Sequence, residues 1–439
     1  MNIKEKAGLT AMQRAEWIAS QSEEEQFIIF MTLPQEAAGK IFECLPLYIQ
    51  KRLLKRIPRK DGAVLLKRLT PDDRTALLQG FPKKILEELL KLLPLDERAE
   101  TVMLLGYPKG SVGRLMTPDY LTAKEEWSVG QVLNEIQAYG GNSETIDIVY
   151  VINAEGKLLD DIQLRDFLFA PSASLVSAIA DYHFLSLSVD ENDETAIQLF
   201  RQYDRGALPV LDESGVLLGI VTIDDILRLS DQEATEDIQK MGGTQALDEP
   251  YMDAPFMELM RKRAGWLVVL FLGETLTATA MAYFADEISK AVVLALFLPL
   301  IISSGGNAGS QASTLIIRAM ALGEVKLKDW WKVIRREFYA GIFLGTILGT
   351  IGFFRVSLWS TFTDIYGQHW LLLAATIFLS LIGVVTWGTF SGACLPLILR
   401  KLGADPATSS APFVATIVDV VGVLIYFMVA LWVLKGVLL

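Results

Sequence analysis

The stretch Pro299–Ser313, PLIISSGGNAGSQAS, interrupts one of the most apolar parts of the chain. It follows the run AVVLALFL, and the chain turns apolar again at Leu315. Proline removes a backbone donor and glycine permits irregular backbone, so the stretch predicts a break in a helix at Gly305, Gly306 and Gly309. The meaning of such a break depends on whether the surrounding segments cross a membrane.

Five segments in the last third of the chain are long and apolar enough to span a bilayer, which takes about 20 residues. They mostly lack the polar face of helices in a soluble domain, so one large soluble helical domain is the weaker alternative. The expected spans are Trp266–Ala285, Ala291–Ile317, Phe338–Trp359, Trp370–Leu399 and Phe413–Leu434.

Basic residues gather on one side of these spans. Arg261-Lys262-Arg263 precedes the first span, and more Lys and Arg residues lie between the second and third. By the positive-inside rule this pattern predicts a cytoplasmic N-terminus and a C-terminus on the outside.

The middle of the chain is strongly acidic. Residues 111–250 contain 8 Lys and Arg against 26 Asp and Glu. Such a region repels nucleic acid, which we do not expect as a partner, and suits divalent cations. Cys44 and Cys394 are too far apart in sequence to indicate a zinc site. Because no nucleophile-and-base pattern and no phosphate-binding GxxxxGK[ST] loop occurs, an enzyme is not expected.

The first region is a repeat of short helices. Proline recurs about every 12 residues, as if it opened each helix, and leucines three and four apart give each helix one apolar side. Stacking such helices buries those sides in a superhelix. The prolines are Pro34, Pro46, Pro58, Pro71, Pro82, Pro94 and Pro108.

Two segments of the middle region share one plan, Asp147–Leu168 and Gly206–Leu227: a strand, a tight turn, a second strand and an acidic helix start. This internal duplication resembles a pair of cystathionine-β-synthase (CBS) domains. CBS pairs often bind adenine nucleotides through a Ser/Thr-x-x-Asp motif, which Thr222 and Asp225 match, so ATP is expected at the second copy only. The alternative is that Thr222 caps a helix.

The whole chain resembles the MgtE family of magnesium channels. The resemblance rests on GGNAGSQ (305–311), on DPATSSAPFVATIVD (405–419), and on the linker EATEDIQKMGG (233–243). It implies a multi-domain homodimer with a superhelical N-domain, an α/β CBS pair, a plug helix and five transmembrane helices. The expected boundaries are 1–112 for the N-domain, 113–174 and 175–232 for the CBS domains, 233–262 for the plug or connecting helix, and 263–439 for the pore domain.

Ionisable residues within the spans are few, namely Glu274, Arg355 and Asp419. A carboxylate in a membrane is costly unless it faces water or a cation, so Asp419 is the main candidate for ion binding. The resemblance adds the carbonyl of Ala415. Glu274 is a weaker candidate, and Arg355 is expected to extend from the outer end of its span.

The helix break predicts what lies on the opposite side of the ion path. Carbonyls freed at Gly305, Gly306 and Gly309, with the amide of Asn307, would face a hydrated ion, and Mg²⁺ keeps its water and prefers oxygen ligands. The alternative is that the glycines only pack helices together.

The resemblance also implies regulatory Mg²⁺ ligands: Glu194, Asp204 and Asp225 in the second CBS domain, and Glu233, Glu236 and Asp237 on the plug helix. Asn192 and Arg228 depart from the aspartates usual in the family, so a regulatory site is weakened, lost or replaced by a salt bridge.

These expectations combine into a function. The chain is expected to take up Mg²⁺ across a bacterial plasma (inner) membrane, with feedback from cytosolic Mg²⁺ and modulation by ATP. The alternatives are transport or export of Co²⁺, Ni²⁺ or Mn²⁺, and a membrane-anchored CBS sensor that conducts no ion.

Overall fold

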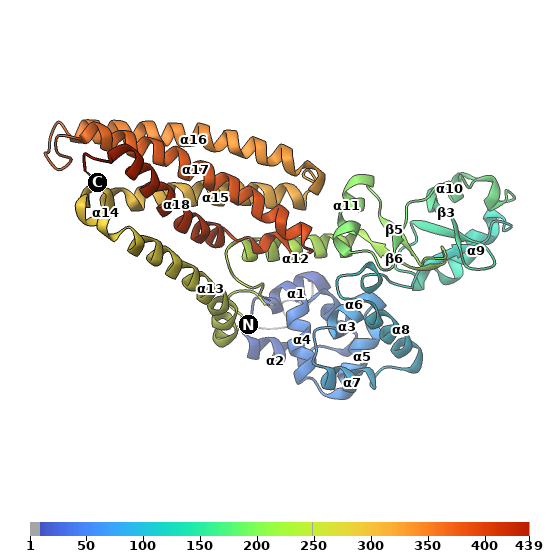
Figure 1. Cartoon of the computed structure of the whole chain (residues 1–439). Coiled ribbons are helices and arrows are strands. Elements are labelled where there is room, and N and C mark those ends of the chain that lie inside the picture. The colour runs from blue at the N-terminus through green and yellow to red at the C-terminus, as the bar shows by residue number, and fades with distance from the viewer. Residues whose placement is uncertain (1–8, 248, 439) are drawn as a thin grey trace. The chain divides into compact units, whose positions relative to one another are not determined.

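The computed structural model describes residues 9–247 and 249–438. It divides into two compact units, Met1–Ser230 and Asp231–Leu439, and each is described by itself. Both are drawn in Figure 1.

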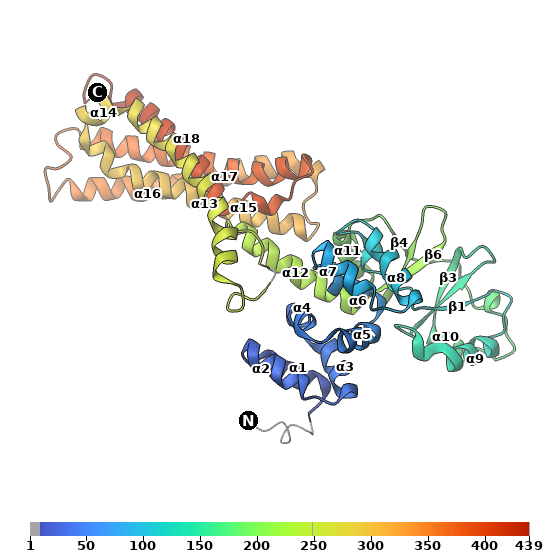
Figure 2. The ribbon, with the colours of Figure 1, turned by 90° about the horizontal axis from the view of Figure 1, so that it is seen from below.

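The N-terminal region of the first unit is a stack of short helices, as the proline repeat predicted (Figure 2). Most of the prolines stand directly before their helix as its N-cap, one position earlier than expected, and only Pro71 is the first residue of a helix. Leucines such as Leu53, Leu66 and Leu77 fill the core between the helices. The helices are α1 Ala11–Ala19, α2 Glu23–Met31, α3 Gln35–Cys44, α4 Leu47–Arg56, α5 Arg59–Arg68, α6 Pro71–Leu78, α7 Lys83–Leu90 and α8 Leu95–Gly106.

The predicted duplication forms two three-stranded sheets with the same topology. In each sheet the middle strand pairs with a parallel strand on one side and an antiparallel strand on the other. The first copy contains β1 Leu121–Ala123, α9 Val129–Tyr139, β2 Ile148–Ile152, β3 Leu158–Gln163 and α10 Leu164–Phe169. The second contains β4 Leu187–Ser188, α11 Asp193–Tyr203, β5 Ala207–Leu211 and β6 Leu217–Thr222.

The two copies share a core. Tyr150 and Leu158 of the first copy pack with Leu217 and Ile220 of the second, and the Tyr120 hydroxyl donates to the Leu217 carbonyl at 3.1 Å. The CBS pair is therefore one module, with short 3-10 turns at Val112–Arg114, Gly140–Asn142 and Val176–Ala178.

The expected plug helix is part of a longer helix. α12 begins directly after β6 and runs from Ile223 to Met241, so it does not extend to residue 262. It ends at Gly242-Gly243, where Gly243 has a φ of +75° that favours glycine. An irregular connection then leads to the next helix at Phe256.

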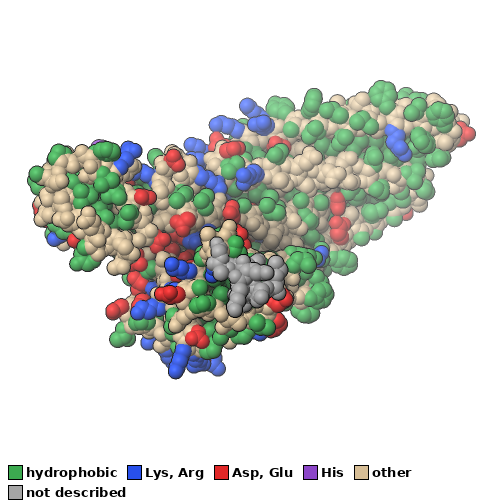
Figure 3. All heavy atoms as spheres, turned by 180° about the vertical axis from the view of Figure 1, so that it is seen from behind, with side chains coloured by type: hydrophobic (Ala, Val, Ile, Leu, Met, Phe, Trp, Pro, Cys, Tyr) green, Lys and Arg blue, Asp and Glu red, His purple; other side chains and the backbone are tan. Residues whose placement is uncertain are grey.

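The second unit contains five helices within its described residues that are long and apolar enough to span a membrane, as predicted. In Figure 3, hydrophobic side chains are spread over the elongated part of the molecule that contains these helices, and charged side chains are sparser there than over the rest. The candidate spans contain α13 Phe256–Tyr283, α15 Leu298–Ala321, α16 Trp330–Trp359, α17 Trp370–Lys401 and α18 Ala411–Leu434. Shorter elements between them are α14 Ala285–Lys290 and the 3-10 segments Val292–Phe297, Leu327–Asp329 and Pro406–Thr408.

The predicted helix break at Gly305–Gly309 is wrong. α15 is continuous from Leu298 to Ala321, and Pro299 lies in its first turn, where a missing backbone donor costs little. Within a bilayer, unpaired backbone groups are costly, so glycines alone do not break a spanning helix.

The glycines instead allow two helices to touch. A Cβ added at Gly388 of α17 would lie 2.3 Å from the carbonyl oxygen of Gly305, and one added at Gly392 would lie 2.1 Å from that of Gly309. The small residues on both helices therefore permit backbone-to-backbone contact, the alternative that the sequence left open.

Gly392→Ala tests this contact. The added methyl group has no room beside the Gly309 carbonyl, so we expect a loss of about 1–3 kcal/mol in stability, measured as a lower thermal transition in detergent. Gly265→Ala in α13 is the matched control, because a Cβ there meets no atom of the described residues within 4 Å. Equal transitions for the two variants would contradict the contact.

Candidate ion-binding sites

Asp419 lies half-buried in the middle part of α18, next to a second acid. The Glu274 carboxyl on α13 is close enough to interact electrostatically with Asp419. The two helices come close because Gly273 leaves room for Thr416, whose methyl carbon would be 2.5 Å from an added Cβ. Two neighbouring carboxylates repel each other, and a shared proton or a cation removes that repulsion.

α15 presents a polar stripe on the side opposite its glycine contact with α17. Ser303, Asn307, Gln311 and Thr314 are exposed and three or four residues apart, which places them on one face. Polar groups at membrane depth require water or a protein partner, so this face is unsuited to lipid. The sequence reading selected Asn307 but missed the stripe, which its spacing could have revealed.

α15 and α18 are held together beside this stripe. Gly306 lies against Ala415, with 3.5 Å between an added Cβ and the Ala415 Cβ. The Ser310 hydroxyl donates to the Ala411 carbonyl at 3.2 Å, and the Ser313 hydroxyl to the Ser409 carbonyl at 3.0 Å. The structure thus joins Gly306 to Ala415, one helical turn before Asp419.

Arg355 lies near the end of α16. Its guanidinium carbon is 5.3 Å from the centre of the Trp359 ring, a cation–π distance. We find no contact between Arg355 and Asp419 among the ion pairs of the described residues.

The C-terminal part of α12 is attached to the connection before α18 by a lysine. Lys240 Nζ lies 2.5 Å from Glu236 and 2.6 Å from Asp405. Burial acts to lower the pKa of Lys240, but the hydrogen bonds to Asp405 and Glu236 outweigh burial and raise it. Glu236, a predicted Mg²⁺ ligand, therefore already has a cationic partner, while Glu233 and Asp237 lie on the same helix.

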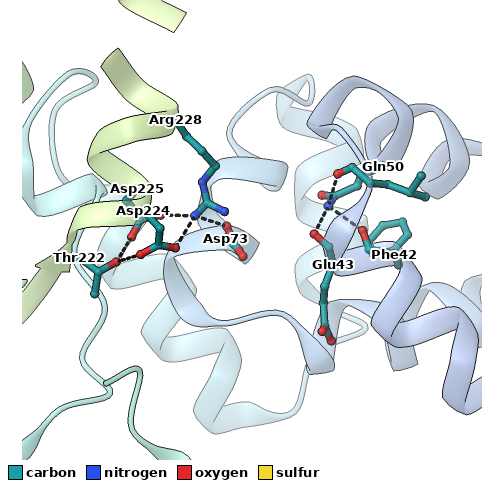
Figure 4. Close-up of polar contacts among 9 residues, drawn as sticks. Phe42, Glu43, Gln50, Asp73, Thr222, Asp224, Asp225 and Arg228 are labelled. Atoms are coloured by element: carbon teal, nitrogen blue, oxygen red, sulfur yellow. Dashed lines mark hydrogen bonds and ion pairs between the residues drawn. The ribbon is translucent and has the colours of Figure 1, made fainter. Parts of the chain in front are cut away.

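Asp225 stands in the first turn of α12 and is also paired. The Thr222 hydroxyl lies 2.9 Å from one oxygen of Asp225 and 2.6 Å from Asp224. The Arg228 guanidinium holds the other oxygen of Asp225. Both residues of the predicted nucleotide motif are thus engaged within the chain, and the Thr222 hydroxyl contacts carboxylates instead of capping the helix (Figure 4).

A group of acids that the sequence reading missed lies beside Asp225. Oxygens of Asp72, Asp73 and Asp225 all lie within 4.8 Å of one another, the spacing of possible metal ligands. Burial, followed by the charges of Asp225 and Asp73, raises the pKa of Asp72 well above its usual value. Burial, followed by the charges of Asp225 and Asp224, raises the pKa of Glu144 to about 7. The sequence signal was the PDD start of α6, although sequence could not place it beside α12.

The other predicted ligands of the second CBS domain lie on α11. Asn192 caps this helix by accepting from the Glu194 N–H at 2.7 Å, and Asp204 ends it with a φ of +47°. Among the described residues, neither Glu194 nor Asp204 joins a group of three close ligand atoms.

Comparisons with known proteins agree with this architecture. Family models match at residues 9–110 (MgtE intracellular N domain), 112–173 and 176–231 (CBS domain) and 298–429 (MgtE, divalent cation transporter). The magnesium transporter MgtE of Thermus thermophilus is 34% identical over 417 residues, covering 94% of this chain and 91% of the relative. This chain belongs to the MgtE family. The resemblance read from its motifs is therefore confirmed.

Other MgtE relatives match over shorter lengths. The magnesium transporter MgtE of Bacillus subtilis is 29% identical over 86% of this chain and 82% of its own, and that of Enterococcus faecalis is 32% identical over 76% and 72%. A crystal structure of the cytosolic domain of the Mg²⁺ channel MgtE in complex with ATP is similar at 28% identity, with a TM-score of 0.49, over 52% of this chain and 92% of that one.

Lys240→Gln tests the attachment of α12. Without the ammonium group, Glu236 and Asp405 face each other as like charges, so we expect the segment after Met241 to be cleaved several times faster by a protease at neutral pH. Lys332→Gln is the control, because the Lys332 side chain is 81% exposed and its ion pair among the described residues is with Asp329. Cleavage at the wild-type rate in Lys240→Gln would show that the lysine does not anchor the helix.

Proposed function

We propose that this MgtE chain is a magnesium channel or transporter that admits Mg²⁺ across a cell membrane. The observation that carries the proposal is the Asp419 carboxyl group, which lies within a spanning helix beside Glu274 and one turn from the Gly306–Ala415 contact. A half-buried carboxylate contributes nothing to packing that an apolar side chain would not, whereas it attracts a cation to a path through the membrane.

The polar stripe on α15 supplies the rest of the path in this proposal. Asn307 and its neighbours along the stripe offer oxygen atoms to a hydrated ion, and Mg²⁺ retains several waters when it binds one or two carboxylates. Gly305 and Gly309 contribute by bringing α15 against α17, and their carbonyls face that helix. Gly306 and Ala415 hold α15 beside α18 at the level of the site.

A homodimer would complete the path. The most apolar window of α13 has no buried residues within the described unit, and the stripe on α15 is also uncovered. A second copy that faces both would pair the two Asp419 side chains across a two-fold axis. The N-terminus then lies in the cytoplasm and the C-terminus outside, as the basic loops predict.

Regulation by cytosolic Mg²⁺ forms the second part of the proposal. Glu194 and Asp204 on the CBS module, with Glu233, Glu236 and Asp237 on α12, are the proposed ligands of ions that stabilise a closed state when Mg²⁺ is plentiful. Asp225, the sixth ligand that the resemblance implied, is left out of this set because Thr222 and Arg228 hold its two oxygens. The net charge of the acidic middle region makes its compact form depend on cations. ATP binding at the CBS pair remains a prediction, and titration calorimetry with ATP and competing AMP tests it.

Mg²⁺ uptake in a magnesium-auxotrophic host tests the ion site. Asp419→Asn and Asp419→Ala remove the charge that attracts the cation, so we expect at least about a tenfold loss of uptake, the scale of one lost charge-assisted contact. Asp364→Asn, which removes an exposed acid between α16 and α17, is the matched control and should support growth. Full growth with both Asp419 variants would remove Asp419 from the ion path, and equal uptake of Co²⁺, Ni²⁺ or Mn²⁺ would favour a broader divalent transporter.

Limited proteolysis of the full chain tests the regulation. If Mg²⁺ bridges acids on α12 and the CBS module, rising Mg²⁺ should slow cleavage within residues 233–243. NaCl at matched ionic strength should protect less, because screening alone does not bridge carboxylates. A cleavage rate that does not change with Mg²⁺ would contradict the proposed regulation, but it would not contradict the proposed ion path.

A further inference from the structure

Three acids from two domains converge in the first unit. Asp72 and Asp73 come from the first turn of α6 in the N-terminal superhelix, and Asp225 comes from the first turn of α12 after the second CBS sheet. We name them the α6–α12 acid cluster. Three carboxylates within 4.8 Å repel one another, so this contact needs positive charge to remain closed.

The burial of Asp72 increases the need for positive charge in this cluster. Asp72 is only 6% exposed, and within the described part of the chain its Oδ1 atom has no hydrogen-bond partner. A buried carboxylate oxygen without a partner is costly, which indicates that the cluster is suited to an additional proton donor or a cation.

Arg228 supplies positive charge to the same cluster. It lies one turn after Asp225 on α12, and its Nη2 atom is 3.2 Å from Asp73 and 3.7 Å from Asp224, with a third contact to Asp225. Figure 4 shows the guanidinium between the acids of α12 and Asp73 of α6. One side chain thus joins the two domains by ion pairs.

The surroundings of Asp225 do not fit a directly bound Mg²⁺. One of its oxygens accepts from Thr222 and the other is held by Arg228. Mg²⁺ requires near-octahedral oxygen ligands at short distance, and a guanidinium at the same carboxylate repels it. The side chain of Asp225 is only 11% exposed, so solvent does little to screen that repulsion.

We propose that the Arg228 guanidinium takes the place of a bound cation and holds α6 against α12 in the absence of Mg²⁺. The N-terminal superhelix of this chain therefore stays docked on the second CBS domain when Mg²⁺ falls. The three acids remain a latent divalent site, which becomes a Mg²⁺ site once the arginine is removed. The proposal relies on the proposed function only in the choice of ion.

Hydrogen exchange of α6 in the full-length protein, with EDTA or with millimolar Mg²⁺, tests the proposal. In the wild type we expect the backbone amides of residues 72–78 in α6 to exchange equally in both conditions. In Arg228→Gln we expect about tenfold faster exchange in EDTA, as when a partner of a buried charge is lost, and recovery in Mg²⁺. Arg59→Gln, which breaks the exposed pair with Glu88, should behave as the wild type.

The double variant Asp73→Asn with Arg228→Gln tests whether repulsion between carboxylates, and not a folding defect, causes the effect of Arg228→Gln. With one carboxylate removed, the contact should be less dependent on Mg²⁺ than in Arg228→Gln alone. The proposal fails if the wild type loses protection in EDTA, if Arg228→Gln exchanges as the wild type, or if Mg²⁺ does not restore it. None of these readouts measures transport, so they are independent of the uptake result.

Discussion

The contact between α15 and α17 positions the membrane-spanning part of the chain. It depends on pairs of glycines that allow backbone to meet backbone, Gly305 with Gly388 and Gly309 with Gly392. Because association of helices in lipid relies on close packing, no larger side chain can replace them without separating the helices. With one face of α15 fixed in this way, its polar stripe must point to the other side.

The position of that stripe helps to explain the role of two acids in the spanning helices, Asp419 and Glu274. Asp419 and Glu274 reach each other because Gly273 lets α13 approach Thr416 on α18. A pair of carboxyl groups at membrane depth is unfavourable without a proton, water or a cation. A chain that places a polar helix face and two acids in its spanning unit is therefore organised for an ion, in agreement with its membership of the MgtE family.

Much of the architecture could be predicted from sequence because it follows local patterns. The proline repeat, the duplicated strand pairs and the apolar spans all depend on residues close together in the chain. The structural role of Gly305 and Gly309 could not be predicted in this way, because it depends on contacts with Gly388 and Gly392, about eighty residues away. A glycine-rich stretch is compatible with a broken helix or with a closely packed one, and only the neighbouring helix decides between them.

The same limit applied to the charged sites. The sequence identified Arg228 as unusual, but its partner Asp73 belongs to another domain, and nothing local to either residue links them. Similarly, Lys240 has Glu236 one turn away, a pair that sequence can predict, whereas Asp405 lies far along the chain. Local spacing therefore makes half of each ion-pair network predictable, and tertiary structure supplies the other half.

Accessibility of the α15 stripe tests the central claim most directly. Cysteine would be introduced at Asn307 in a chain whose Cys44 and Cys394 are changed to serine, and the rate of its reaction with a cationic, water-soluble thiol reagent would be measured in membranes. If the stripe lines a hydrated path, Asn307→Cys reacts readily and Mg²⁺ slows the reaction, while Phe343→Cys, on an exposed apolar face of α16, stays unreactive. Equal reaction rates at the two positions, or a rate at Asn307→Cys that does not change with Mg²⁺, would contradict a hydrated ion path along the α15 stripe.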